Sequence, residues 1–210
     1  MKGVQVSAPA AEASPDSARD GGFRRRLLDG LAVSIDERGY RDSTVADIVR
    51  HARTSKRTFY DQFATKEECF AELLMDNSAQ IVATIRKAVV PDAPWHIQIR
   101  QAVVAYVDTI EASTAITLSW IRELPALGES ARPTLRRGFG GLVTMIVDLT
   151  ANSGFRDAGI DPVSPEAAVI LVGGLRELTA QTVEDGHPVR TILEPAVAAS
   201  MAILGPKPKV

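Results

Sequence analysis

The sequence predicts an all-α protein in two parts, a small unit of three helices near the N-terminus followed by a larger helical bundle. Apolar residues recur every three or four positions along most of the chain after residue 22, and no segment keeps the alternation expected of a strand. Proline, glycine and N-cap residues divide this pattern into helix-sized segments. Only 5% of the 210 residues are aromatic while 45% are apolar, so the core is expected to consist mainly of aliphatic side chains on closely packed helices.

The N-terminal segment predicts a tail and one helix. Residues 1–22 are rich in Ala, Ser, Pro and Gly without an apolar period, and we expect a mobile tail there. Residues 23–38 are expected to form a helix, with Gly39 at the position of a C-terminal cap. The apolar stripe of this helix consists of Leu27, Leu28, Leu31, Ala32 and Ile35.

A short second helix is expected to begin after Thr44. Thr44 is a natural N-cap, and Asp47 stands three residues later, where it can return a hydrogen bond. Helical apolar spacing then continues to Ala52. The residues that follow, 52–54, predict a tight connection.

A third and a fourth helix follow at once. Ser55 is expected to cap a helix over about residues 55–62, in which Phe59 and Phe63 face inward because they lie four residues apart. Thr65 and Glu68 predict a second capping box, which opens a longer helix that ends before Pro91.

The remainder of the chain predicts five further helical segments. Pro125 is expected to end one of them, Pro133 lies near the start of another, and Ser164-Pro165-Glu166 is a strong start signal. Pro195 predicts a kink or a late start. The segments are residues 95–112, 114–124, 129–152, 164–185 and 189–204.

Positive charge is concentrated in the region of the three short N-terminal helices. Residues 23–66 carry ten Lys or Arg and six acidic side chains, a net charge of +4, whereas the whole chain has a net charge of -2. A basic segment favours a polyanionic partner, and a plain solvated surface explains the charge equally well. We expect residues 23–68 to form one domain and residues 69–210 a second.

The three short helices predict a helix-turn-helix unit that binds double-stranded DNA. Lys56 or Arg57 is expected to contact guanine in the major groove, and Thr44, Tyr60 and Lys66 are expected to contact phosphates. Surface charge without a ligand, and packing of Tyr60 beside Phe63, are the alternatives. The full set of predicted DNA-binding residues is Thr44, Arg53, Thr54, Ser55, Lys56, Arg57, Thr58, Tyr60, Gln62 and Lys66.

The stretch RDSTVADIVRHARTSKRTFYDQFATKEECFAELL resembles the N-terminal DNA-binding segment of the TetR (tetracycline-repressor) family of bacterial transcriptional regulators. The matching features are Thr44-Val45-x-x-Ile48, Ser55-Lys56-x-Thr58-Phe59-Tyr60-x-x-Phe63 and Lys66-Glu67, within about residues 24–75. The resemblance implies an obligate homodimer, an operator with two half-sites and a C-terminal pocket for a small effector. It thereby implies that residues 23–68 are the DNA-binding domain and residues 69–210 the effector-binding and dimerisation domain. One departure is Arg53, which stands where the family usually has glycine, so either Arg53 is strained or the turn avoids a positive φ.

Two helices near the C-terminus are candidates for the dimer interface that the resemblance implies. Residues 167–175 are apolar on every face, and the last helix carries a stripe of small apolar residues. An ordinary core within one subunit is the alternative. The predicted interface residues are Ile170, Gly174, Leu178, Ile192 and Val197.

Large apolar side chains in the C-terminal part are candidates for the lining of an effector pocket, with plain core as the alternative. Because few charges fall on these faces, the expected effector is small and largely apolar, for example a fatty-acyl or other lipid-like molecule. The predicted lining consists of Trp95, Tyr106, Leu118, Trp120, Phe139, Leu142, Val143 and Ile146.

These observations predict a cytoplasmic, ligand-responsive repressor that its effector releases from the operator. An activator, an effector-independent DNA-binding protein and an all-helical enzyme are the alternatives, and the sequence offers no convergent catalytic set for the last. We expect no cofactor and no metal, because His51, His96 and His187 lie far apart and Cys69 is the single cysteine. No membrane segment is expected, since the longest uncharged run, 195–206, is shorter than the ~20 residues of a spanning helix.

Overall fold

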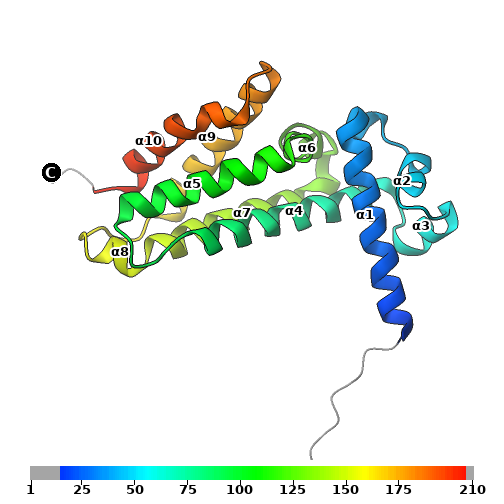
Figure 1. Ribbon diagram of the computed structural model, residues 1–210, viewed down its shortest axis with the longest axis horizontal. Coiled ribbons are helices and arrows are strands. Elements are labelled where there is room, and N and C mark those ends of the chain that lie inside the picture. Colours follow the sequence, from blue (N-terminus) through cyan, green and yellow to red (C-terminus); the bar gives the residue numbers. More distant parts are fainter. Residues whose placement is uncertain (1–14, 207–210) are drawn as a thin grey trace, which may run out of the picture.

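The computed structural model describes residues 15–206, and all of their side chains except those of residues 15–20 and Ser130. Helices joined by short connections make up this part of the chain, and it contains no strand (Figure 1). None of these helices is both long enough and apolar enough to cross a membrane. The elements are α1 (Pro15–Asp42), α2 (Val45–His51), α3 (Lys56–Gln62), α4 (Lys66–Ala88), α5 (Trp95–Ala112), α6 (Thr114–Ala126), η1 (Gly128–Ala131), α7 (Arg132–Thr150), α8 (Ser153–Arg156), α9 (Pro165–Glu184), η2 (Val189–Ile192) and α10 (Leu193–Leu204).

The first helix starts earlier than the sequence predicts. Residues 15–22, which we expected in the tail, extend α1 by two turns. Proline suits this start, because the first turn of a helix needs no backbone N–H from it. Residues 1–14 of the predicted tail lie outside the described residues. Gly39 has a φ of 79°, so the backbone departs from helical geometry where the cap was predicted, before a last turn that reaches Asp42.

The three-helix unit has a core of its own at one end of the molecule, where α1, α2 and α3 lie together (Figure 1). Leu27 and Leu31 of α1 contribute to the same buried cluster as Ile48 of α2 and Phe59 and Phe63 around α3. Each of these side chains is almost wholly inaccessible to water. The apolar stripes predicted for the three helices therefore meet, and they fix α3 against α1.

The helix α4 runs from this unit into the bundle. Thr65 caps it as predicted, since its side chain accepts a hydrogen bond from the backbone N–H of Glu68. The Glu68 carboxylate reaches back to the N–H of Ala64, at 2.8 Å, one residue further than in the predicted capping box. Our predicted domain boundary, between residues 68 and 69, lies in the first turn of α4, so this helix is part of both domains.

The bundle follows the predicted segments closely, with four differences. The predicted last helix, 189–204, opens with the 3-10 turn η2, and α10 starts only at Leu193, two residues before Pro195. The helix predicted over residues 95–112 is α5 with the same bounds. Pro125 lies inside the last turn of α6 instead of ending it, and a 3-10 turn precedes α7. The short helix α8, which begins at Ser153, was predicted as the end of the preceding segment. In each case the helix end is decided by a few residues whose periodicity is too short to recognise.

Candidate nucleic-acid interface and ligand cavity

The helix α3 is anchored by its aromatic side chains and capped by Ser55. Phe59 and Phe63 are buried, and the Ser55 hydroxyl accepts a hydrogen bond of 3.1 Å from the backbone N–H of Thr58. Because the two phenylalanines point inward, Arg57 and Tyr60 point away from the core. The Tyr60 side chain is 58% exposed, although its ring also contacts the edge of Phe59.

The positive charges of this surface have no acidic partners. The side chains of Arg53, Lys56 and Arg57 are exposed, and none forms a hydrogen bond or ion pair with another residue in the range 15–206. By contrast, Arg24 pairs with Glu72, and other arginines pair with acids on α2 and α6. Cations that are not neutralised internally are the groups that bind nucleic-acid phosphates and release counterions.

Arg53 adopts the left-handed conformation that glycine usually provides. Its φ is 49°, the one positive φ of a non-glycine residue in the described chain. The turn closes through hydrogen bonds from the N–H groups of Arg53 and Thr54 to the carbonyl oxygens of Arg50 and Val49. The sequence left two possibilities, a strained Arg53 or a turn that avoids a positive φ, and the structure shows the first. The left-handed conformation of Arg53 is expected to cost roughly 1–2 kcal/mol.

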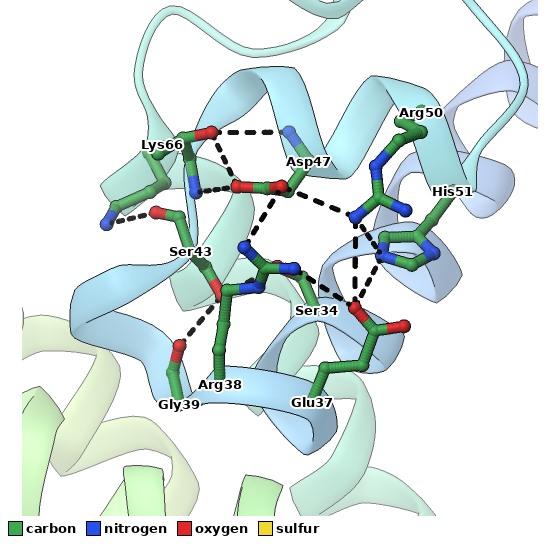
Figure 2. Close-up of polar contacts among 10 residues, drawn as sticks. Ser34, Glu37, Arg38, Gly39, Ser43, Asp47, Arg50, His51 and Lys66 are labelled. Atoms are coloured by element: carbon green, nitrogen blue, oxygen red, sulfur yellow. Dashed lines mark hydrogen bonds and ion pairs between the residues drawn. The ribbon is translucent and has the colours of Figure 1, made fainter.

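A polar network holds α2 against α1 (Figure 2). The N–H of Thr44 donates to the Asp47 carboxylate at 3.1 Å, and the N–H of Asp47 donates to the Thr44 hydroxyl at 3.3 Å, so the predicted capping box is confirmed. Hydrogen bonds from the Thr44 side chain, and then from its backbone, lower the pKa of Asp47 to about 2. The same carboxylate lies 3.3 Å from the guanidinium of Arg38, which ties the start of α2 to α1.

The end of α2 is fixed to the same face of α1. The His51 Nε2 lies 3.1 Å from the Glu37 carboxylate, and Arg50 lies 3.8 Å from it (Figure 2). These side chains are thereby used within the domain. Arg53 in the turn, and Lys56 and Arg57 in the first turn of α3, take no part in this network.

Lys66 lies differently from the other predicted contacts. Its ammonium group donates to the carbonyl oxygen of Ser43 at 2.9 Å (Figure 2). It also donates to the carbonyl oxygen of Tyr40 at 3.2 Å and lies 4.2 Å from the centre of the Tyr40 ring. It thus stabilises the end of α1. A phosphate contact from Lys66 stays a prediction.

The remaining predicted DNA-binding residues lie around the same face. Thr44 is exposed, while Thr54, Thr58 and Gln62 are half-buried. The Thr58 hydroxyl is hydrogen-bonded to that of Ser55, at 3.0 Å. The structure brings these residues together with the free cations, but no bound nucleic acid tests their roles.

The bundle contains a partly open cavity of about 90 Å³ between α4, α5, α7, α8, α9 and α10. Of the predicted lining residues, Tyr106, Leu142 and Ile146 lie in its wall. Most of the rest of the wall is aliphatic or aromatic and includes Ile85, Val89, Ile99, Val103, Met145, Leu149, Phe155, Leu171, Val172, Leu175 and Leu204.

The other five predicted lining residues lie outside the wall of this cavity. Trp120 and Leu118 belong to the core next to the three-helix unit, where the Trp120 ring covers Gly138. Trp95 packs over Gly205 near the end of α10. Phe139 and Val143 are half-buried outside the cavity wall. A helical stripe predicts which face is buried, but it does not predict which neighbour that face meets.

Four polar residues that the sequence analysis did not select, Gln98, Thr150, Arg176 and Ser200, also line the cavity. The signal for Arg176 is its position after the run 167–175, where a charge interrupts an apolar helix. Ser200 gives no comparable signal, because serine is common on packed helix faces.

The predicted dimer interface divides into exposed and buried members. Ile170 is 67% exposed and Gly174 is exposed, while Leu178 is half-buried against the bundle core. Ile192 and Val197 are only 1% and 3% exposed and belong to the core of the subunit, so they are not available to a partner. The small apolar stripe of α10 packs on α5 and α9 of its own chain, which is the alternative that the sequence left open.

The described residues offer little for catalysis or metal binding. Within residues 15–206 no group of three or more His, Cys, Asp or Glu side chains is placed to hold a metal ion. Burial raises the pKa of the Cys69 thiol to about 12, which disfavours a reactive thiolate.

Comparison with known proteins agrees with the architecture. Residues 27–73 match the family described as bacterial regulatory proteins, tetR family. Over 58 residues, 28% of the chain, the sequence is 38% identical to the uncharacterized HTH-type transcriptional regulator YdgC of Bacillus subtilis, and the match spans only 30% of that relative.

Solved structures extend the likeness to most of the chain. The fold is similar to that of the transcriptional regulator FadR from Bacillus subtilis in complex with stearoyl-CoA, with a TM-score of 0.71 and 15% identity over 87% of this chain and 99% of that one. It is also similar to reduced NemR from E. coli, with a TM-score of 0.68 and 19% identity over 89% of this chain and 100% of the other. At these identities the likeness establishes the fold alone.

Proposed function

We propose that the protein is a ligand-responsive transcriptional regulator, from the premise that residues 27–73 match the family of bacterial regulatory proteins, tetR family. Its expected action is repression, relieved when a small effector binds in the bundle. It acts on chromosomal DNA and therefore in the cytoplasm.

The observation that carries this proposal is the set of free cations on an anchored helix. Arg53, Lys56 and Arg57 have no acidic partners among the described residues, and they surround the capped N-terminus of α3. Such a helix can enter the major groove with its first turn against the bases, while neighbouring groups bind phosphates. If the protein were an enzyme with an incidental basic helix, the clustering of unpaired cations at the N-terminus of α3 would have no explanation.

A homodimer would present two copies of α3 to an operator with two half-sites. Reading of successive major grooves requires a separation of about 34 Å. The exposed apolar side chains Val169 and Ile170 on α9 support an interface there, because large apolar groups are costly to leave in water.

An effector is expected to occupy the cavity of the bundle. Its largely apolar wall favours a fatty-acyl or other lipid-like molecule, and FadR, one of the proteins with a similar fold, binds stearoyl-CoA. The helix α4 contributes Ile85 to this wall, Val89 follows directly after its end, and the helix begins next to α3. Binding of the effector and of DNA would then be coupled reciprocally.

The test begins by selecting an operator from randomised duplexes with the wild-type protein. Arg57→Ala and Tyr60→Ala are each expected to weaken binding to that duplex at least tenfold, while the oligomeric state stays unchanged. The matched control is Arg137→Ala, which removes an equally exposed arginine on α7. Unchanged affinity for both α3 variants would reject the proposed interface.

A further inference from the structure

One arginine in the wall of the bundle cavity has no acidic partner. Arg176, on α9, lines the cavity, and its Nε is buried without a hydrogen-bond acceptor. Its guanidinium forms no ion pair with any residue of the described range, and lies 5.6 Å from the centre of the Phe139 ring. Burial lowers the pKa of Arg176, yet arginine keeps its proton in proteins. A cation is therefore present in a largely apolar wall.

The acidic residue nearest to Arg176 in the sequence, Glu177, already forms an ion pair with another arginine. Glu177 binds Arg122 at 2.9 Å, and Glu184 binds the same guanidinium at 2.7 Å. Other arginines of the bundle are likewise neutralised: Arg86 by Asp148, Arg100 by Glu194, and Arg190 by Asp108 and Glu111. A partly buried charge without a partner is less stable than one that is paired, and an anion that binds beside Arg176 would offset that cost.

A second polar group in the same wall also lacks a partner. Ser200 is only 2% exposed, and its hydroxyl has no hydrogen-bond partner in the described chain. The other polar side chains of the wall are satisfied: Gln98 donates to Pro91 and Ala93, Thr150 accepts from Val163, and Tyr106 pairs with Thr179. Two of the four buried unpartnered side-chain atoms in residues 15–206 thus line this one cavity.

The size and charge of the cavity restrict the ligand further. Gln98 and Tyr106 both line it, and eight residues of helix separate them by about 12 Å, so an extended apolar group fits alongside α5. Among the described residues of the wall, Arg176 carries the one positive charge and none is acidic. One guanidinium neutralises one carboxylate, and its fork of N–H groups matches that geometry. A dianionic phosphate would keep excess charge in the cavity.

We propose that the effector is an amphipathic carboxylate, with its carboxylate on Arg176 and its alkyl or aryl body in the apolar part of the cavity. This inference rests on the proposed function, because it names the chemical class of the effector. Ser200 supplies a further hydrogen-bond donor for a polar substituent of the ligand.

Calorimetric titration of the full-length protein, without DNA, tests the inference. The ligands are octanoate and dodecanoate, the alcohols of the same chain length, and the corresponding acyl-CoA thioesters. The wild type is expected to bind one of the carboxylates at least tenfold more tightly than its alcohol and its thioester. Arg176→Met is expected to abolish this preference, Arg176→Lys to retain part of it, and Arg137→Met, on the outer surface, to leave it unchanged.

Equal affinity for the carboxylate and the alcohol, tighter binding of the thioester, or no saturable binding would each overturn the inference. If Arg176→Met fails to fold, the affinities of the wild-type protein for carboxylate, alcohol and thioester still test the inference. A separate titration of operator DNA with the bound carboxylate tests the regulatory response. Carboxylate binding with unchanged operator affinity would reject the regulatory proposal and leave the carboxylate site intact.

Discussion

Arg24 of α1 donates a hydrogen bond of 2.6 Å to the carbonyl oxygen of Gln62, the last residue of α3. The same guanidinium forms an ion pair with Glu72 of α4 and lies 4.2 Å from the centre of the Phe63 ring. One side chain thus links three helices, and it neutralises the negative end of the helix that is expected to read DNA.

Arg24→Met is expected to lower the free energy of unfolding by ~1–2 kcal/mol, because charged hydrogen bonds are lost at a partly buried site. Operator affinity should fall as well, since the orientation of α3 is less restricted. Urea denaturation and a DNA-binding titration measure the two effects. The control is Arg25→Met, whose ion pairs with Asp29 and Asp76 are more exposed and should contribute little. Equal effects of the two variants would contradict the linking role.

Arg53→Gly is expected to raise the free energy of unfolding by ~1 kcal/mol, because glycine adopts a positive φ without strain. Arg53→Ala keeps the strain and should not stabilise the domain. Both variants remove the same charge, so both should reduce the slope of log affinity against log salt by about one phosphate contact. Thermal melts and salt titrations separate the backbone effect from the charge effect. A stabilised alanine variant would show that strain is not the cause.

Gly138→Ala is expected to destabilise the protein by ~1–3 kcal/mol through overpacking, because the new methyl group would overlap the Trp120 ring. Gly140→Ala, in the same helix, meets no neighbouring atoms and should stabilise by ~0.5–1 kcal/mol. The two changes are chemically identical, so differential scanning calorimetry compares packing alone. The expectation fails if both variants shift the melting temperature in the same direction.

The capping carboxylate of Asp47 predicts a pH dependence. Its pKa in the folded protein is about 2, below the ordinary value, so its stabilising effect is present above about pH 4 and is lost as the pH falls toward 2. Asp47→Asn removes this effect at every pH. The difference in melting temperature between wild type and variant should therefore shrink between pH 5 and pH 2. A difference that is constant with pH would reject this assignment.

Ile170→Glu is expected to convert a dimer into monomers, since it introduces a charge into the exposed apolar face of α9. Val90→Glu, at a similarly exposed position between α4 and α5, is the control and should leave the dimer intact. Sedimentation velocity measures the outcome over a range of concentrations. Dimers of Ile170→Glu at wild-type affinity would place the interface elsewhere.

Local signals in the sequence predicted the helices and caps of the N-terminal three-helix unit well. The caps at Thr44, Ser55 and Thr65 act within three or four residues, and the inward pair Phe59 and Phe63 follows from helical spacing. Each of these interactions depends on neighbours along the chain, so no knowledge of the tertiary arrangement is required.

The bundle was predicted less well because its features depend on contacts between distant helices. Trp120 fills the space over Gly138 on another helix, and the sequence does not indicate this pairing. An apolar stripe such as that around Ile192 is the same whether it meets its own chain or a partner. The sequence does not show that Arg176 lacks an acidic partner, because its neighbour Glu177 could pair with it. In the structure Glu177 binds Arg122.

The 23-residue helix α4 joins the two regions on which the proposals rest. It begins beside α3 and ends with Ile85 in the wall of the cavity, as one rod about 34 Å long. A tilt of roughly 5° about the cavity end of such a lever moves the opposite end by about 3 Å, comparable to the length of a hydrogen bond. A small displacement of the cavity wall would thus become a larger displacement at the surface that carries Arg57 and Tyr60.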